Sequence, residues 1–389
     1  MQKAILPIVT IALAFTLLIQ EPQHEVTAIN IEVPVRVFEG SKFVENLTID
    51  DFEIYEDGVL QKIEAVYLIK KASIKKSEGK KIFSPKTSRN FYLLFEITEY
   101  TPKIEDAIDY FIQNVLLPTD NLVITTPIKA YGVKKEILRK APKSEIARQF
   151  KSILKKDAWI GNSEYKSIVR NLIGLTRALS SDSFIRDEYS AEEYKEMTLE
   201  RYEYLLNRLE SLRKLDSKKL MDFAEYLKGQ EGQKFVFLFY QREFLPQLKP
   251  RDFARLSGNF KILDLYGFFF RELTFDIEKV EQAYSDSSIS IHFLFFTKPA
   301  EYIPGIIMQE HSEDIFSAFR DMALATGGTM ESSSNPTYLF QKTVEASENL
   351  YLIYYSPKNY KADGKFKKIE VKVKGKDYNV THRTWYIAD

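Results

Sequence analysis

The pattern that most constrains the fold is a short apolar strand that runs directly into polar residues between positions 90 and 101. Residues 91–95, FYLLF, are continuously apolar and are bounded by polar side chains. A run of this kind is typical of a β-strand buried on both faces. In open α/β sheets, ligands bind in the crevice beyond the carboxyl ends of such strands. Because Glu96, Thr98 and Glu99 follow the strand at once, they mark a candidate ligand or metal site.

Charge and cysteine content exclude several classes of function. The 389-residue chain carries 55 basic and 55 acidic residues. It therefore has no net field to attract nucleic acid, and we expect no nucleic-acid partner. The absence of cysteine excludes disulfides, thiol catalysis and thiolate metal sites. The four histidines are scattered along the chain, which does not indicate a zinc site.

Residues 1–20 have the pattern of a signal peptide or N-terminal anchor. Lys3 precedes an apolar run at 4–19, and a polar stretch follows it. A short positive start and an apolar region too short to span a bilayer comfortably are typical of a signal peptide. No small-x-small cleavage site follows the run, so an uncleaved anchor remains the alternative. We expect an exported protein that is periplasmic, secreted or associated with the cell envelope, with membrane anchoring only through residues 1–20.

Both ends of the remaining chain have β patterns. Residues 28–70 contain alternating apolar and polar positions, and Asp57-Gly58 between two such runs is a strong hairpin signal. Residues 349–389 indicate three further strands, at 350–356, 366–373 and 378–387. A sheet of so few short strands is marginal alone. We therefore expect the N- and C-terminal segments to meet in one small β-sandwich.

The central residues, 90–346, alternate between strand and helix patterns. Residues 235–239 and 289–296 resemble the strand at 91–95, and helical spacing of apolar residues lies between them. This alternation predicts an α/β fold with a doubly wound, mostly parallel sheet covered by helices on both faces. We interpret residues 190–228 as a helical insertion that packs on the sheet. Residues 71–89, rich in lysine and serine, are expected to be a linker.

Several segments resemble a known family. Residues 47–58, LTIDDFEIYEDG, closely resemble the opening of bacterial exported proteins that contain a von Willebrand factor A-like (VWFA-related) domain. Residues 324–328, LATGG, and 351–357, YLIYYSP, are similar to the closing segment of that family. Residues 227–234 resemble its lead-in to the fourth strand. The resemblance covers nearly the whole mature chain in order, and it implies a VWFA-like domain over residues 90–346.

The resemblance also implies a degenerate metal-ion-dependent adhesion motif. In that family, Asp-x-Ser-x-Ser, a Thr and an Asp at the carboxyl edge of the sheet hold a cation such as Mg²⁺, which prefers oxygen ligands. The matching oxygen donors here are Glu96, Thr98 and Ser163. Tyr100 replaces the second Ser, and Arg242 brings a positive charge where an acidic residue is expected. We expect these residual positions to hold no metal and the protein to need no cofactor.

Three functions follow from these expectations. The favoured one is a non-enzymatic, adhesion-type interaction module that binds another protein of the cell envelope or exterior. The alternative is weak, Mg²⁺-dependent ligand binding through Glu96, Thr98 and Ser163. The third is a hydrolase of unknown type. Only the crevice supports it, because neither a GxSxG elbow nor an HExxH motif is present.

Overall fold

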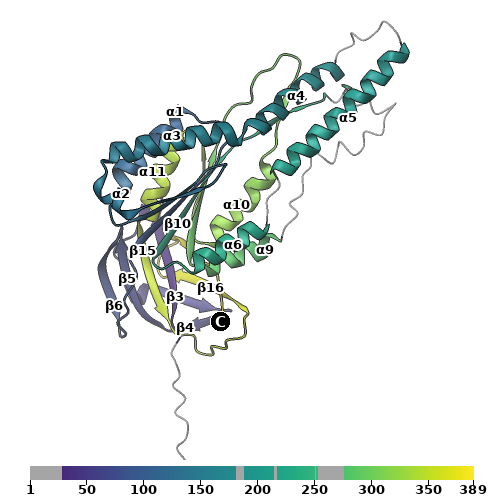
Figure 1. Ribbon diagram of the computed structural model, residues 1–389. Helices are drawn as coiled ribbons and strands as arrows, with labels where there is room; N and C mark the ends of the chain where they lie inside the picture. The colour runs from purple at the N-terminus through teal and green to yellow at the C-terminus, as the bar shows by residue number, and fades with distance from the viewer. Residues whose placement is uncertain (1–28, 181–187, 214–216, 250, 253–275) are drawn as a thin grey trace, which may run out of the picture.

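The computed structural model describes residues 29–180, 188–213, 217–249, 251–252 and 276–389 (Figure 1). The expected signal peptide or anchor, residues 1–20, lies outside this part of the chain. Among the helices that the structure describes, none is both long and apolar enough to cross a membrane.

A six-stranded mixed sheet lies at the centre of the molecule. Its strands follow the order β14-β12-β10-β7-β8-β9, and neighbours pair in parallel except at β9, which is an antiparallel edge. The predicted strands at 91–95, 235–239 and 289–296 are confirmed. The bounds are β7 (Arg89–Glu96), β8 (Asn121–Thr125), β9 (Ala130–Val133), β10 (Gln233–Gln241), β12 (Ile289–Phe296) and β14 (Met330–Ser333).

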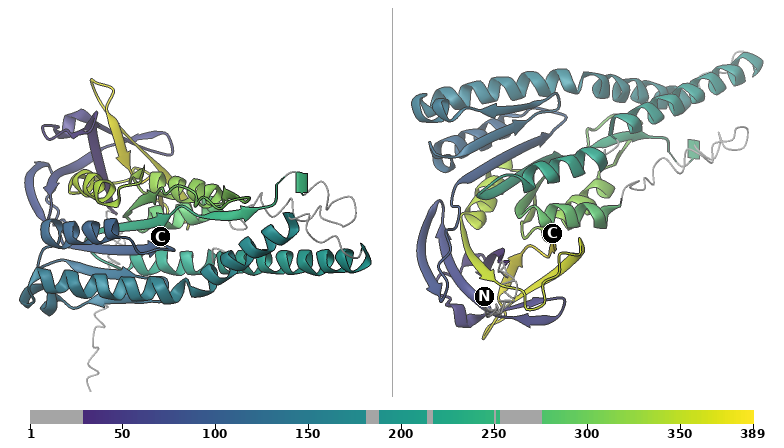
Figure 2. Two further views of the ribbon diagram at one scale, coloured as in Figure 1. Left: turned by 90° about the horizontal axis from the view of Figure 1, so that it is seen from above. Right: turned by 60° about the horizontal axis from the view of Figure 1, so that its bottom comes forward.

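Helices cover both faces of this sheet, as Figure 2 shows. Side chains alternate between the faces along each strand, so each face has its own apolar core. The first face packs against α1 (Pro102–Tyr110), its π-helical extension (Phe111–Val115), α3 (Lys143–Gly161) and α11 (Pro336–Ser347). The second face packs against α6 (Ser217–Lys228), α9 (Ile277–Asp286) and α10 (Glu313–Ala325). The short helix α2 (Lys135–Lys140) precedes α3.

The N- and C-terminal segments pair directly with each other. A curled, six-stranded antiparallel sheet has the order β17-β1-β15-β5-β6, with β2 beside β1, and a four-stranded sheet has the order β18-β16-β3-β4. Both sheets contribute to one apolar core. The bounds are β1 (Ile31–Glu39), β2 (Lys42–Phe43), a 3-10 turn (Ile49–Asp51), β3 (Phe52–Glu56), β4 (Val59–Gln61), β5 (Ile63–Lys70), β6 (Ser73–Gly79), β15 (Asn349–Tyr355), β16 (Phe366–Val373), β17 (Asn379–His382) and β18 (Trp385–Ile387).

The predicted hairpin at Asp57-Gly58 is confirmed. It joins β3 to β4, which pair antiparallel, with Ile54 opposite Gln61. Asp57 has a φ of 47° and Gly58 a φ of 80°. A two-residue turn with both central residues at positive φ matches the twist of the flanking strands, and Asp-Gly adopts it at low cost.

The predicted fold class is wrong for the molecule as a whole. The described sheets are mostly antiparallel, and parallel pairing is confined to the one mixed sheet. The molecule is therefore not a doubly wound, mostly parallel, von Willebrand factor A-like sheet. The terminal segments form a curled, half-barrel sheet with a second sheet against it, not a small β-sandwich. The physical reason lies in the connections: tight turns such as Asp57-Gly58 cannot make a crossover, so they force antiparallel neighbours.

Two local expectations also need correction. The expected linker, residues 71–89, contains β6, which pairs antiparallel with β5. The strand expected at 378–387 is divided into β17 and β18, which join different sheets: β17 pairs with β1, and β18 with β16.

A helical arm extends from the mixed sheet. Helices α4 (Ser163–Ser180) and α5 (Glu188–Arg213) project together from the body in Figure 1. They share an apolar core that includes Leu172, Tyr202 and Leu206, with Leu245 from the ribbon of β11 (Phe244–Gln247) and β13 (Ile307–Glu310). The expected helical insertion is thus a pair: α6 packs on the sheet as predicted, whereas α5 packs on α4.

Candidate functional site

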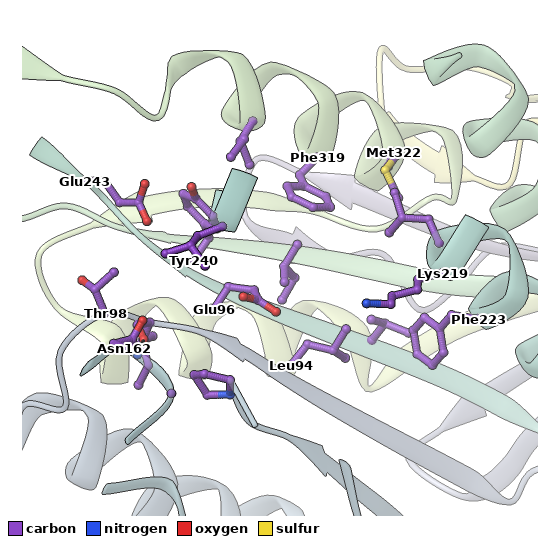
Figure 3. A pocket seen from close by; sticks show the side chains of 18 of the residues that line it. Leu94, Glu96, Thr98, Asn162, Lys219, Phe223, Tyr240, Glu243, Phe319 and Met322 are labelled. Atoms are coloured by element: carbon purple, nitrogen blue, oxygen red, sulfur yellow. Dashed lines mark hydrogen bonds between the residues drawn. The ribbon is translucent and has the colours of Figure 1, made fainter. Parts of the chain in front are cut away.

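A cavity of about 410 Å³ lies between the mixed sheet and helices α6, α9 and α10 (Figure 3). Its walls are mostly apolar. They include Leu94, Val236, Leu238, Phe223, Phe319 and Met322. The charged residues that line it are Glu96, Glu164, Lys219 and Glu243.

Strand alternation directs the candidate residue Glu96 into this cavity. Residues 91, 93 and 95 of β7 point to the first face of the sheet, which packs against α1, α3 and α11 and is called the filled face below. Leu94 and Glu96 therefore point to the second face. Glu96 is the last residue of β7, and its register partner on β10 is Tyr240, which also lines the cavity. In Figure 3, the Glu96 side chain lies near the middle of the cavity.

The Glu96 carboxylate lies in an unusual electrostatic setting. Its side chain is exposed to water within the cavity. No other described residue makes a hydrogen bond or ion pair with it. Because protein surrounds the cavity, enclosure raises the pKa of Glu96 above its usual value, and the negative charge of Glu243 raises it further. Glu96 is therefore an acceptor without a counter-ion among the described residues.

A glutamine holds the loop that carries Thr98. The Gln241 Oε1 atom accepts hydrogen bonds from Thr98 N at 3.0 Å, Thr98 Oγ1 at 3.0 Å and Glu99 N at 2.9 Å. Asn162 donates from Nδ2 to the carbonyl oxygens of Ile97 at 2.9 Å and Ala158 at 2.8 Å. The loop after β7 is thus fixed to both β10 and the end of α3. Gln241 and Asn162 were not predicted as site residues.

Only part of the predicted metal motif comes together. Glu96 and Thr98 both line the cavity. Ser163 is exposed at the first position of α4 and is not among the lining residues, although Asn162 and Glu164 on either side of it are. The Thr98 hydroxyl already donates to Gln241. In the described part of the chain, no group of three or more His, Asp or Glu side chains is placed to hold a metal ion.

Tyr100 and Arg242 both lie away from the cavity. Tyr100 packs against the apolar core on the opposite face of the sheet. Arg242 forms an ion pair of 2.9 Å with Glu310, and its guanidinium lies 5.7 Å from the ring centre of Phe295. The positive charge of Arg242 that was expected near the motif is therefore held in an ion pair. Glu310 neutralises it outside the cavity.

Sequence reasoning missed the charged residues Lys219 and Glu243. Lys219 belongs to α6, far along the chain from β7, and only the packing of α6 on the sheet brings it to the cavity. Gln241 could have been found. It ends a buried strand that was expected to lie in the same sheet as β7, and carboxyl ends of parallel strands meet at one edge.

Comparisons with known proteins place this chain in no family. No protein-family model matches it, and no curated protein does. Among solved structures, the chain is similar to the human COPII-coat protein Sec24c, with 7% sequence identity and a TM-score of 0.32. The match covers 78% of this chain and 43% of the Sec24c chain, so it spans less than half of that protein's length. A likeness this low supports no conclusion on fold or function.

Proposed function

We propose that this protein is a non-enzymatic binding protein that holds a small amphipathic molecule in the cavity between the mixed sheet and helices α6, α9 and α10. The observation that carries the proposal is the cavity itself, which measures about 410 Å³ and has mostly apolar walls with a few charged groups. Ligand pockets of roughly 300–1,000 Å³ with this lining are typical of small-molecule sites. Protein interiors otherwise leave few voids larger than a water molecule.

The chemistry of the lining favours binding over catalysis. Among the lining carboxylates, Glu96 is the one without a partner in the part of the chain that the structure describes, and the neighbouring Thr98 hydroxyl is hydrogen-bonded to an amide oxygen, not to a base. A nucleophile needs a base within hydrogen-bond reach to be activated. The Thr98 hydroxyl is therefore not bonded to the base that would activate it as a nucleophile.

A fluorescence titration tests the proposal. Nile red, a neutral apolar dye, is added to the purified protein and to two variants. Leu238→Trp places a large side chain in the cavity, and Val59→Trp places the same side chain on exposed β4 as the control. We expect saturable binding to the parent protein and to Val59→Trp, and a loss of about tenfold or more in Leu238→Trp. Equal binding by a folded Leu238→Trp, or no saturable binding at all, would overturn the proposal.

We also propose that the protein acts outside the cytoplasm, on the strength of the apolar run at 4–19. Fractionation of cells that produce the full chain tests this. Recovery in the medium, periplasm or envelope fraction supports export. Recovery in the cytoplasm, from a host whose export machinery is active, contradicts it.

The interaction with another envelope protein is a second candidate function. The observation that favours it is the projecting arm, on which Tyr194 is 41%, Met197 60% and Tyr204 65% exposed. Their spacing of three and seven residues places them on one side of α5. A photo-crosslinking residue at Met197, compared with one at exposed Ile82, tests it in the source envelope. A partner captured only from position 197 supports the candidate. The same products from both positions contradict it.

A further inference from the structure

We propose that the ligand is a hydrophobic amine, whose positively charged nitrogen binds the Glu96 carboxylate while its hydrocarbon part lies against the apolar walls of the cavity. This inference rests on the proposed small-molecule function and names the chemical class of the ligand.

The charged groups of the cavity point to a cation. Glu164 already has a partner, since it forms an ion pair of 2.7 Å with Arg208. Lys219 and Glu243 each have a partner as well. Among the charged lining residues that the structure describes, Glu96 is the one whose carboxylate has neither a hydrogen bond nor an ion pair. Protein surrounds this carboxylate although water reaches it, so it is less well solvated than a surface carboxylate and pairing with a cation is favourable.

The position of Glu96 makes it suited to hold a cation. Its backbone belongs to the parallel ladder with β10, and the loop that follows is held by three hydrogen bonds to Gln241. The backbone that carries Glu96 is therefore fixed before a ligand arrives, which lowers the entropic cost of binding. A fatty acid fits less well, because it would bring another negative charge beside Glu96 and Glu243.

The arrangement of the walls gives the ligand a direction. In Figure 3, polar Thr98, Asn162 and Glu243 lie on one side of Glu96, while Phe223, Phe319 and Met322 lie on the other, together with Lys219. A nitrogen at Glu96 leaves the side with Phe223, Phe319 and Met322 for a hydrocarbon chain, and the Lys219 ammonium on that side has a partner within the protein. Aromatic rings along the wall, such as Tyr240 and Phe319, add attraction for a cation near their faces.

A matched set of probes tests this inference. Dodecylamine, dodecanol and dodecanoic acid share one chain length and differ only in the head group. Each is used to displace Nile red at neutral pH, below the concentration at which it forms micelles. We expect the amine to bind about tenfold or more tightly than the acid, with the alcohol between them.

Two variants locate the effect at Glu96. Glu96→Gln should weaken amine binding by about tenfold and leave alcohol binding unchanged, because only the charge is lost. Glu99→Gln is the matched control. Glu99 lies on the same loop but forms an ion pair of 3.4 Å with Lys298 and does not line the cavity, so we expect no change. Thermal unfolding confirms that both variants fold.

The outcomes separate this inference from the function on which it rests. If the acid or the alcohol binds as tightly as the amine, or Glu96→Gln leaves amine binding intact, the amine assignment is wrong and the binding function stands. If millimolar Mg²⁺ displaces the amine from the parent protein, the site takes an inorganic cation and the amine assignment is wrong as well. If Nile red itself does not bind to the parent protein, the binding function fails.

Discussion

The two faces of the mixed sheet are built from the same strands but are packed in opposite ways. On the first face, aromatic rings stack closely: the ring centres of Phe95 and Phe239 are 4.4 Å apart and nearly parallel. The space among these rings has no room for water. On the second face, a cavity of about 410 Å³ separates the strands from the helices. Phe95 and Glu96 are neighbours in the chain, yet one lies in the tightest part of the core and the other in the cavity.

The two faces of the sheet therefore have different roles: one stabilises the sheet, and the other carries the candidate site. The close-packed rings of the filled face add to the backbone pairing that holds β7 and β10 in register. Because β7 and β10 are held in this way, Glu96 and Tyr240 have fixed backbone positions although the cavity face is not tightly packed. The comparison implies that substitutions of the same kind will have unequal effects on the two faces.

The largest expected effect comes from truncating side chains on each face. Phe239→Ala removes a ring that stacks on Phe95, and should lower the free energy of unfolding by about 3–5 kcal/mol. Leu238→Ala, on the cavity face, should cost about 2 kcal/mol, near the lower end for such changes, because the space beside it is already open. Chemical denaturation followed by circular dichroism measures both. An equal or larger cost for Leu238→Ala would contradict the unequal packing of the faces.

The next effect comes from enlarging side chains. Leu93 is buried on the filled face, so Leu93→Phe should destabilise the protein by about 1–3 kcal/mol through overpacking. Leu238→Phe adds the same volume to the cavity face and should be neutral or stabilising by about 0.5–2 kcal/mol. Unfolding midpoints of the two variants, measured side by side, give the answer. Destabilisation by Leu238→Phe to the same degree would show that the cavity is closed in solution.

A smaller effect is expected at the loop that ends the cavity. Gln241→Ala removes the acceptor of three hydrogen bonds from Thr98 and Glu99. We expect a loss of about 1–2 kcal/mol, because donors that are left unsatisfied in a buried place are costly. Gln241→Glu is the control, since it keeps an acceptor oxygen at the same reach. If Gln241→Ala unfolds at the same denaturant concentration as the parent protein, Gln241 does not hold the loop.

The buried strands of the mixed sheet could be predicted from the sequence, whereas the type of strand pairing in the molecule as a whole could not. Continuous apolar runs such as 91–95 and 235–239 identify buried strands without help from distant residues. Sheet type is different, because it depends on how connections pair strands that are far apart in the chain. Alternation over residues 90–346 predicted a doubly wound, mostly parallel sheet, whereas the described sheets are mostly antiparallel and parallel pairing is confined to one mixed sheet.

The candidate site was predicted in part for the same reason. Glu96 and Thr98 follow directly from the end of β7, so a local pattern located them. The ion pair of Arg242 could not be predicted from neighbouring residues, because its partner Glu310 lies at the end of β13, far along the chain. The cavity was not predictable either. The stripe of apolar residues on α6 indicates that it packs on the sheet, but not how closely.

The smallest expected effect is the pH dependence that Glu96 brings to the cavity face. Enclosure and Glu243 raise the pKa of Glu96 in the folded protein above its value in the unfolded chain. The folded state then binds this proton more tightly than the unfolded chain does. Keeping Glu96 ionised therefore lowers the free energy of unfolding, fully above the raised pKa and less as pH falls through it. Because water reaches the carboxylate, the effect is small.

Glu96→Gln should therefore be at least as stable as the parent protein at neutral pH, and its advantage should shrink as pH falls towards the ordinary glutamate range. Thermal unfolding at a series of pH values measures the trend. Leu94→Ala lies on the same face and cannot titrate, so its difference from the parent should stay constant across the series. A constant difference for Glu96→Gln as well would mean that Glu96 is hydrated as in the unfolded chain. The cavity face would then be an open surface, with no enclosed carboxylate to set against the filled face.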